Sequence, residues 1–175
     1  RWPWDRSGQA ELVSRLNEAG AKVIGLDVNF PEDSVPSEDR ALADALAEAG
    51  NVVLPIEFSF TDQGEFPIYD QNRIVAPIQE IRNQAAALGF SNAPLDADGI
   101  VRRVPLAADN DDQGRAYGFA YAAGRLAETV PPVQAVPLDD RGRMIIHFPG
   151  RPGEAFQRIS AHQIFEEEIE ADAIE

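Results

Sequence analysis

The chain has 175 residues and a mass of 19.1 kDa, and 44% of its residues are apolar, which is typical of a globular protein rather than a disordered one. Its formal net charge of −15 at pH 7 argues against nucleic acid or an anionic membrane surface as a main partner, because both are bound through basic patches. Cysteine is absent, which excludes disulfides, thiolate catalysis and metal sites built on cysteine.

Two consecutive helix-then-strand units are predicted in the first third of the chain. Apolar residues at helical spacing predict helices between residues 5 and 20 and between residues 37 and 50, each ending at a glycine. Each helix is followed by a continuous apolar run, at 23–26 and at 52–56, which is typical of a strand buried on both faces. Helices alternating with buried strands imply parallel pairing through right-handed crossovers.

The pattern is less regular after residue 60. Residues 61–72 form a polar, turn-rich segment, which is followed by a predicted helix over 77–88. A strand is predicted over 100–106. The alanine-rich segment 117–127 predicts a well-buried helix.

A hairpin and a capped helix are predicted near the end of the chain. Two apolar segments, 133–138 and 143–148, flank a turn at 139–142, and this arrangement favours an antiparallel hairpin. Ser160 and Gln163 form a capping box that starts a final helix. We therefore predict that residues 1–175 form a single α/β domain with a mixed sheet, parallel in its first part, flanked by helices and carrying a C-terminal antiparallel hairpin.

The candidate binding residues lie where the predicted parallel strands end. Asp27 closes the first strand, Asn29 faces the same side two residues later, and Glu57 follows the second strand. Ligands of open α/β sheets bind beyond the carboxyl ends of the strands. We expect a pocket there, at which Asp27, Asn29, Glu57 and one of Arg102 or Arg103 converge.

Each of these candidates also has a structural interpretation. Asp27 can instead cap a loop or accept backbone hydrogen bonds. Arg102 and Arg103 lie in a predicted strand and should point to opposite faces, so that one binds an anion while the other pairs with a surface carboxylate. The alternative is that both arginines are ion-paired or solvated.

Asp27 also raises the alternative of an aspartate-based hydrolase. Phosphotransferases with an aspartyl nucleophile need further carboxylates for magnesium and a lysine or arginine for phosphate. Residues 27–30 instead run directly into Pro31, and no hydroxyl residue follows to help bind phosphate. The sequence has no nucleophile elbow, no glycine-rich phosphate loop and no histidine motif with metal-ligand spacing. We predict no catalytic residue, no metal and no cofactor.

Two tryptophans, Trp2 and Trp4, bracket Pro3 directly before the first helix. Such a pair of indoles makes a large apolar anchor. It can serve as a lid over the first helix, or as a docking surface or aromatic wall for a ligand.

Several segments, in this order, are similar to a known family. The opening Arg-Trp-Pro-Trp-x-Arg precedes Ala-Glu-Leu-x-x-Arg-Leu at 10–16 and Gly-Asn-Val-Val-Leu at 50–54. Asp-x-Asp-Gly-x-x-Arg-Arg-x-Pro-Leu follows at 96–106, and Phe-Pro-Gly at 148–150. Together they resemble the second CHASE family, the extracellular sensory domains associated with cyclases and histidine kinases.

The resemblance implies a non-enzymatic sensory module on the periplasmic side of the cytoplasmic membrane, within a bacterial receptor whose output is a cytoplasmic cyclase or kinase. It also implies a strand before Arg1 and another after Glu175, so that terminal strands of the sheet would lie outside this chain. No apolar run approaches the ~20 residues that cross a bilayer, so membrane segments too would lie outside the chain. A homodimer is expected from the same resemblance. No catalytic residue or ligand follows from it.

We therefore expect a sensor of a small molecule or a periplasmic protein, with Trp2 and Trp4 coupling the signal to the membrane. The main alternative is a protein-docking module for a periplasmic partner. An ordered pocket of ~300 Å³ or more would favour the ligand-binding interpretation over docking.

Overall fold

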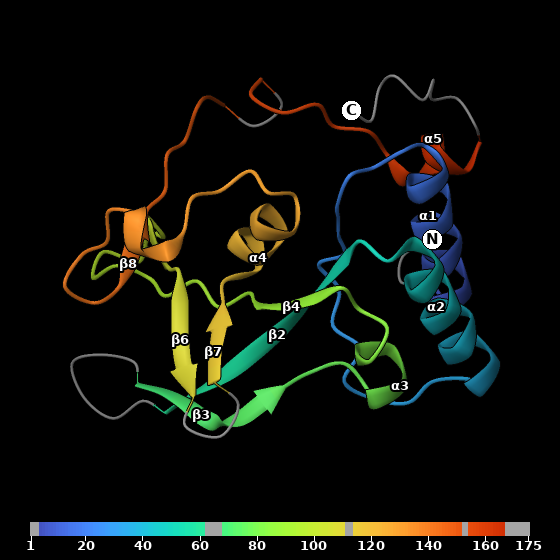
Figure 1. Ribbon diagram of the computed structural model, residues 1–175, viewed down its shortest axis with the longest axis horizontal. Coiled ribbons are helices and arrows are strands. Elements are labelled where there is room, and N and C mark those ends of the chain that lie inside the picture. The colour runs from blue at the N-terminus through green and yellow to red at the C-terminus, as the bar shows by residue number, and fades with distance from the viewer. Residues whose placement is uncertain (1–3, 62–67, 111–113, 152–153, 167–175) are drawn as a thin grey trace.

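The computed structural model describes residues 4–61, 68–110, 114–151 and 154–166 (Figure 1). The helices are α1 (Arg6–Glu18), α2 (Pro36–Ala49), α3 (Gln79–Arg82), α4 (Phe119–Leu126) and α5 (Ala161–Phe165), with a 3-10 turn η1 (Val133–Ala135). The strands are β1 (Ile24–Gly25), β2 (Val52–Thr61), β3 (Ile68–Val75), β4 (Ala87–Phe90), β5 (Arg103–Pro105), β6 (Ala107–Asn110), β7 (Gly114–Tyr117) and β8 (Arg143–Ile145).

Strand β2 is the centre of the main sheet. Its first part pairs in parallel with β1 on one side and with β4 on the other, and its last part pairs antiparallel with β3. Two further antiparallel pairs, β5 with β8 and β6 with β7, complete the strands of the described residues. The predicted α/β class, with a mixed sheet that is parallel in its first part and flanked by helices, is confirmed.

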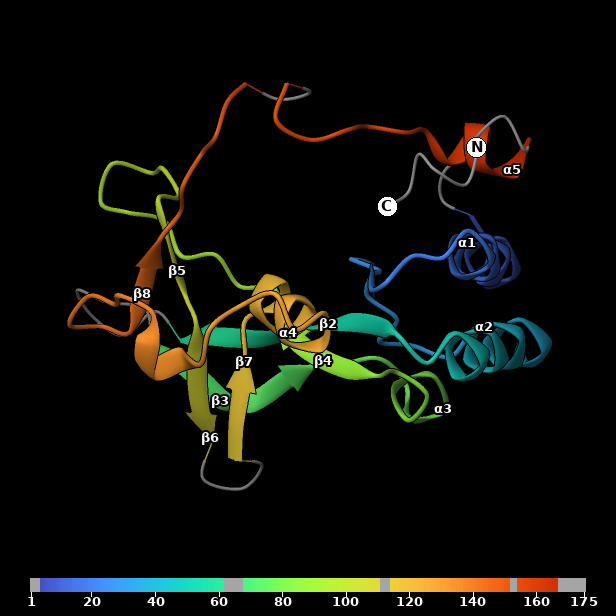
Figure 2. The same cartoon turned by 45° about the horizontal axis from the view of Figure 1, so that its top comes forward.

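Helices α1, α2 and α3 lie at one end of the structure, β5 and β8 lie at the other, and α4 lies between them (Figures 1 and 2). The main core lies between α1, α2 and the parallel strands. Its fully buried side chains include Val13, Leu42, Leu46, Val52 and Leu54. Burial of these apolar faces drives the first two helix–strand units together.

The predicted helix over 77–88 is wrong for most of its length. Helix α3 has only four residues, and the chain then enters β4, where Leu88 pairs with Leu54 of β2. The helical spacing of the apolar residues is overridden here by parallel pairing with the buried strand. The preceding segment also contains more strand than predicted, because β3 begins at Ile68.

The predicted strand pairing of the C-terminal hairpin is also wrong. The turn at 139–142 is present, and the backbone N–H of Gly142 donates to the carbonyl of Asp139 at 3.0 Å. However, β8 pairs with β5, and the expected partner segment contains the 3-10 turn η1. Pro137 interrupts that segment, and proline has no N–H with which to join a strand ladder.

Candidate ligand-binding site

A cavity of about 530 Å³ lies beyond the carboxyl ends of β1 and β4. Asp27 follows β1 and residues 90–93 end and follow β4, while α4, the segment 130–137 and the β5–β8 pair form the remaining walls. The volume falls within the range of small-molecule sites. The cavity therefore has the location and the size that were expected of a binding pocket.

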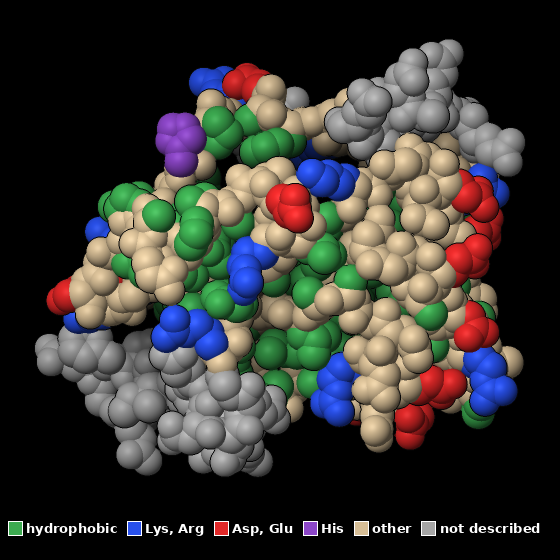
Figure 3. All heavy atoms as spheres, viewed as in Figure 1, with side chains coloured by type: hydrophobic (Ala, Val, Ile, Leu, Met, Phe, Trp, Pro, Cys, Tyr) green, Lys and Arg blue, Asp and Glu red, His purple; other side chains and the backbone are tan. Residues whose placement is uncertain are grey.

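The walls of this cavity are almost entirely apolar. They include the buried Phe90, Leu106 and Tyr121 and the half-buried Val104 and Met144. Figure 3 shows hydrophobic side chains gathered on the face that carries α4 and β8. An apolar molecule that enters this cavity leaves water without losing hydrogen bonds, and such burial is favourable.

The few polar side chains of the cavity differ in whether they already have hydrogen-bond partners. The amide of Asn92 is fully used, because its Oδ1 accepts from the N–H of Phe58 at 2.8 Å and its Nδ2 donates to the carbonyl of Phe58 at 3.0 Å. Asp27 is exposed and has no hydrogen-bond or ion-pair partner among the residues that the structure describes. Its carboxylate is thus available at the edge of an otherwise apolar site.

Glycine places α4 against the strands. A Cβ atom on Gly89 would lie 2.5 Å from the Cα of Phe119, so no larger residue fits between β4 and the start of α4. On β1, the other parallel partner of β2, a Cβ on Gly25 would lie 3.3 Å from the ring of the same Phe119. The cavity wall formed by α4 depends on this close approach of backbone to backbone.

Segment 130–137 is fastened to α4. The hydroxyl of Tyr121 donates to the carbonyl of Pro131 at 2.7 Å, and Val130 packs on Gly124. Helix α4 is nevertheless less buried than predicted, since Tyr121 and Ala122 are its buried residues and Leu126 is 37% exposed. Because Tyr121 both lines the cavity and holds this segment, the position of one wall is linked to the other.

Of the five predicted ligand residues, Asp27 alone lines this cavity within the described part of the chain. Asn29 and Glu57 lie together, with the Asn29 Nδ2 donating to the Glu57 Oε1 at 2.7 Å. Arg102 and Arg103 are engaged elsewhere, as described next. The structure therefore pairs Asn29 with Glu57, brings both arginines to Asp96, and does not place these four residues around Asp27 in this cavity.

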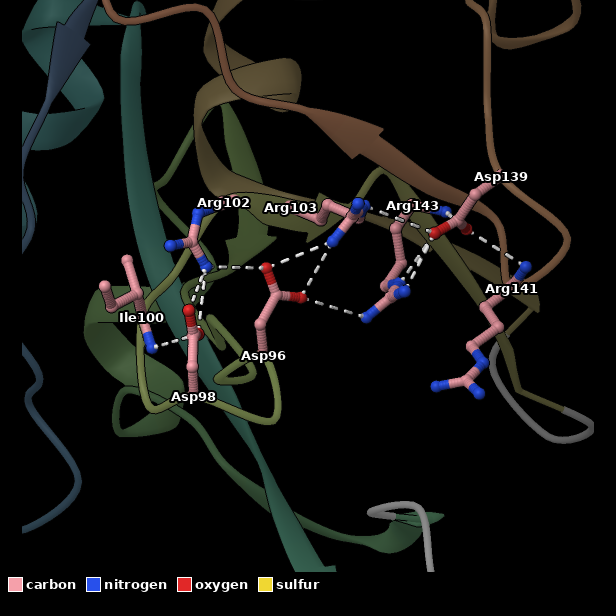
Figure 4. Close-up of polar contacts among 8 residues, drawn as sticks. All are labelled: Asp96, Asp98, Ile100, Arg102, Arg103, Asp139, Arg141 and Arg143. Atoms are coloured by element: carbon pink, nitrogen blue, oxygen red, sulfur yellow. Dashed lines mark hydrogen bonds and ion pairs between the residues drawn. The ribbon is translucent and has the colours of Figure 1, made fainter.

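Arg102 and Arg103 belong to an ionic cluster around Asp96 (Figure 4). Arg103 donates to both oxygens of Asp96 at 3.0 Å, and Arg102 pairs with the same carboxylate at 3.6 Å and with Asp98 at 2.8 Å. The expected division, with one arginine free to bind an anion and the other paired with a surface carboxylate, is not formed, because both arginines pair with aspartates of the loop at 96–99. Both arginines are ion-paired, which is the structural alternative.

The cluster continues into the turn before β8. Asp139 accepts from the backbone and side chain of Arg143, which also lies 3.8 Å from Asp96. Hydrogen bonds from Arg143 lower the pKa of Asp139, above all the bond from its backbone N–H. The hydrogen bond from the side chain of Arg102 lowers the pKa of Asp98 and raises the pKa of Arg102. These groups fasten the loop at 96–99 to β5 and β8, behind the cavity wall.

Trp4, one of the two predicted coupling residues, lies at the opposite end of the structure from the β5–β8 pair. The rings of Trp4 and Phe165 meet edge to face with centroids 5.3 Å apart, and Arg15 donates to the carbonyl of Ile164. Helix α5, which begins with the predicted capping box, is thus packed on α1 (Figures 1 and 2). Trp2 lies outside the described residues.

The described ranges contain neither a metal-ligand group nor a membrane-spanning helix. No group of three or more histidine, aspartate or glutamate residues there is arranged to hold a metal ion. No helix among those residues has the length and apolar character that a membrane crossing requires.

The family model of the CHASE2 domain matches residues 1–175, the whole chain. No curated protein and no solved structure is significantly similar to it. The resemblance indicated by the sequence motifs is thereby confirmed.

Proposed function

Since this chain belongs to the CHASE2 family of extracellular sensory domains, we propose that it is the extracytoplasmic ligand-binding module of a bacterial transmembrane receptor, anchored through segments outside this chain. The cavity of about 530 Å³ at the ends of β1 and β4 is the observation that carries this proposal. Its ligand is a small apolar molecule. The receptor passes the signal to a cytoplasmic cyclase or kinase, and the module itself is not an enzyme.

Charge and wall chemistry support an apolar ligand that is not anionic. The one carboxylate at the cavity, Asp27, would repel an anion, and the chain as a whole carries a charge of −15. The arginines that were predicted to bind an anion are bound to Asp96 and Asp98 instead. A neutral or weakly basic apolar molecule is not repelled by these negative charges and needs no arginine to bind it.

The aspartate-based hydrolase has little support from the same geometry. A phosphoryl-transfer site needs a cation beside the nucleophile and carboxylates to hold magnesium. Asp27 has no ion-pair partner and joins no metal-ligand group among the described residues. A ligand-binding role for Asp27 requires neither of these partners.

A signal requires the ligand to bind one arrangement of the module better than another. To shift a receptor from 1:99 to 99:1, the difference in binding free energy must be ~5.5 kcal/mol. We propose that α4 and the attached segment 130–137 move on binding and that α1, with Trp2 and Trp4, passes the change toward the membrane. Replacing Trp2 and Trp4 with alanine in the full-length receptor should abolish the response while the purified module keeps its ligand affinity.

The test of the cavity uses the neutral fluorescent probe N-phenyl-1-naphthylamine. We expect saturable binding to the chain and a loss of affinity of about tenfold or more in Ala120→Trp, since a lost contact of 1.4 kcal/mol is tenfold in affinity. Ala120 is an exposed residue of α4 that lines the cavity, so the indole fills the site without disturbing the core. Ala47→Trp, at an exposed position of α2, is the matched control and should bind the probe like the parent chain.

The protein-docking alternative rests on exposed apolar side chains near the end of the chain, which are Ile145, Phe148 and Phe156. If the probe does not saturate, or if the two tryptophan variants bind it equally, the cavity is not the sensory site. That outcome would favour the docking module.

A further inference from the structure

A second cavity, of about 410 Å³, lies at the start of α1. It is bounded by Trp4, Asp5, Arg6 and Gln9 on one side and by the loop 28–34 on the other. None of these residues lines the apolar cavity described above. The two cavities also differ in character, because charged and amide side chains make up much of the second one.

Carboxylates dominate the charge of this second cavity. Asp5, Glu32 and Asp33 are all exposed residues of its lining. Arg6, the only cation among the described residues that line it, is already neutralised by an ion pair with the buried Asp39. Asp5 is the N-cap of α1 and accepts from the N–H of Gly8 at 2.8 Å, so the uncompensated negative charge of the cavity comes from Glu32 and Asp33.

Arg6 makes several contacts that stabilise the fold. Its guanidinium also donates to the carbonyl of Glu32 and lies 5.4 Å from the centroid of the Phe30 ring. These contacts hold the loop 28–34 against α1. They leave no free positive charge on Arg6 to balance the carboxylates around it.

Gln9 is the feature that indicates a bound donor. It lines the cavity, is only 5% exposed, and its Oε1 is buried with no hydrogen-bond partner. An unpaired buried acceptor is unfavourable, and native structures contain few of them. The terminal torsion of glutamine is broad and roughly two-fold, so rotation of the amide can bring the oxygen to a ligand in the cavity.

Two more lining residues suit an organic cation. The Nδ2 of Asn29 is occupied by Glu57, which leaves the Oδ1 of Asn29 as an acceptor. Trp4 adds an indole, whose apolar face can cover the carbon chain of an amine. A metal ion is a poorer fit, since no metal-ligand group is found among the described residues.

We propose that this cavity is a binding site for a small primary amine, with the ammonium group donating to the Oε1 of Gln9. Glu32 and Asp33 balance its charge, and Trp4 contacts its carbon chain. The proposal is independent of the apolar ligand. Its failure would leave the cavity at the ends of β1 and β4 unaffected.

The test titrates n-butylamine at about 0.15 M ionic strength, where the Debye length is ~8 Å and long-range attraction is screened. In a Trp2→Phe background, Trp4 is the only tryptophan of the chain, so its fluorescence reports on the site itself. We expect a saturable change in that fluorescence. Tetramethylammonium, a cation without N–H donors, should bind about tenfold more weakly, because it cannot donate to Gln9.

Four variants separate the site from general attraction to an acidic protein. Gln9→Met should weaken n-butylamine binding about tenfold, and Glu32→Gln and Asp33→Asn should each weaken it several-fold. Asp44→Asn removes an exposed charge on α2 outside the cavity and should have no effect. Gln9→Met should melt no lower than the parent, since it removes an unpaired buried oxygen.

Three results would each overturn the proposal. They are the absence of saturable binding, equal affinities for n-butylamine and tetramethylammonium, and equal losses in Asp33→Asn and Asp44→Asn. If Gln9→Met fails to fold, the exposed Glu32 and Asp33 variants decide the question alone.

Discussion

The two ends of the molecule differ in how they use apolar side chains. At the end formed by α1, α2 and the parallel strands, these side chains are packed against one another, and Val13, Leu42 and Leu46 are fully buried. At the other end, around α4 and the β5–β8 pair, similar side chains surround a cavity. The first end is built as a scaffold and the second can adapt to a ligand. The difference suggests that stability and binding can be altered separately.

The largest expected effect comes from opening a hole in the packed end. Leu46→Ala should lower the free energy of unfolding by about 2–5 kcal/mol, the usual cost of removing a fully buried leucine side chain. Urea denaturation followed by circular dichroism measures it. The matched variant Leu126→Ala, at the partly exposed end of α4, should lose about 1 kcal/mol or less. Similar losses in both variants would contradict the division into two ends.

A smaller effect is expected where α4 meets the sheet. Gly89→Ala places a Cβ 2.5 Å from the Cα of Phe119, so α4 must shift, at a cost of about 1–3 kcal/mol in stability. Because α4 forms one wall of the apolar cavity, the affinity for N-phenyl-1-naphthylamine should fall as well. In Gly150→Ala the nearest atom is 3.8 Å from the new Cβ, so neither quantity should change. A stable Gly89→Ala chain that binds the probe normally would show that the wall does not depend on this contact.

The same contrast separates what could be predicted from the sequence from what could not. The first two helix–strand units were predicted because their helical periodicity and continuous apolar strands are local features. The strand β4 was mistaken for the end of a helix, because Ile81, Ala85 and Leu88 have helical spacing whereas the decisive interaction, the pairing of Leu88 with Leu54, is distant in the sequence. The pairing of β8 with β5 also joins segments about forty residues apart, and no local pattern indicates it.

The candidate sites show the same limit. Asp27 was predicted at the ends of the parallel strands from a rule of topology, and the structure places it at the apolar cavity. The apolar walls were missed, because α4 and segment 130–137 come together only in the folded chain. Gln9 carried a signal that was not used: it lies one turn before Val13, on the buried side of α1. A polar residue at such a position calls for a partner.

The third effect, smaller again, is expected where α5 joins the scaffold. Trp4→Ala removes the edge-to-face contact with Phe165, which is worth about 1 kcal/mol, the size of an aromatic pair. Since α5 has five residues and no fully buried side chain, its amide protons should then exchange faster while those of α2 keep their protection. Hydrogen exchange followed by mass spectrometry resolves the two helices. Phe156→Ala, at a side chain that is 73% exposed, is the control, and equal exchange of α5 in both variants would mean that Trp4 does not hold it.

The smallest effect concerns the ionic cluster behind the cavity, and it depends on pH. The hydrogen bonds from Arg143 lower the pKa of Asp139 in the folded protein. The folded protein then binds this proton less readily than the unfolded chain, in which an aspartate has a pKa of about 3.9. The contribution to stability is therefore complete above that value and is lost as the pH falls through the lower pKa of the folded state.

Asp139→Asn removes this contribution, so the variant should unfold at lower urea than the parent at pH 7. The difference between them should shrink below about pH 4, where the carboxyl group of the parent is also protonated in the unfolded chain. Asp140→Asn, at the exposed neighbouring position, is the matched control and should follow the parent at every pH. If the difference in urea midpoint between Asp139→Asn and the parent stays constant down to pH 2, the asparagine destabilises the turn for steric reasons. In that case the charge of Asp139 does not fasten the turn to β8.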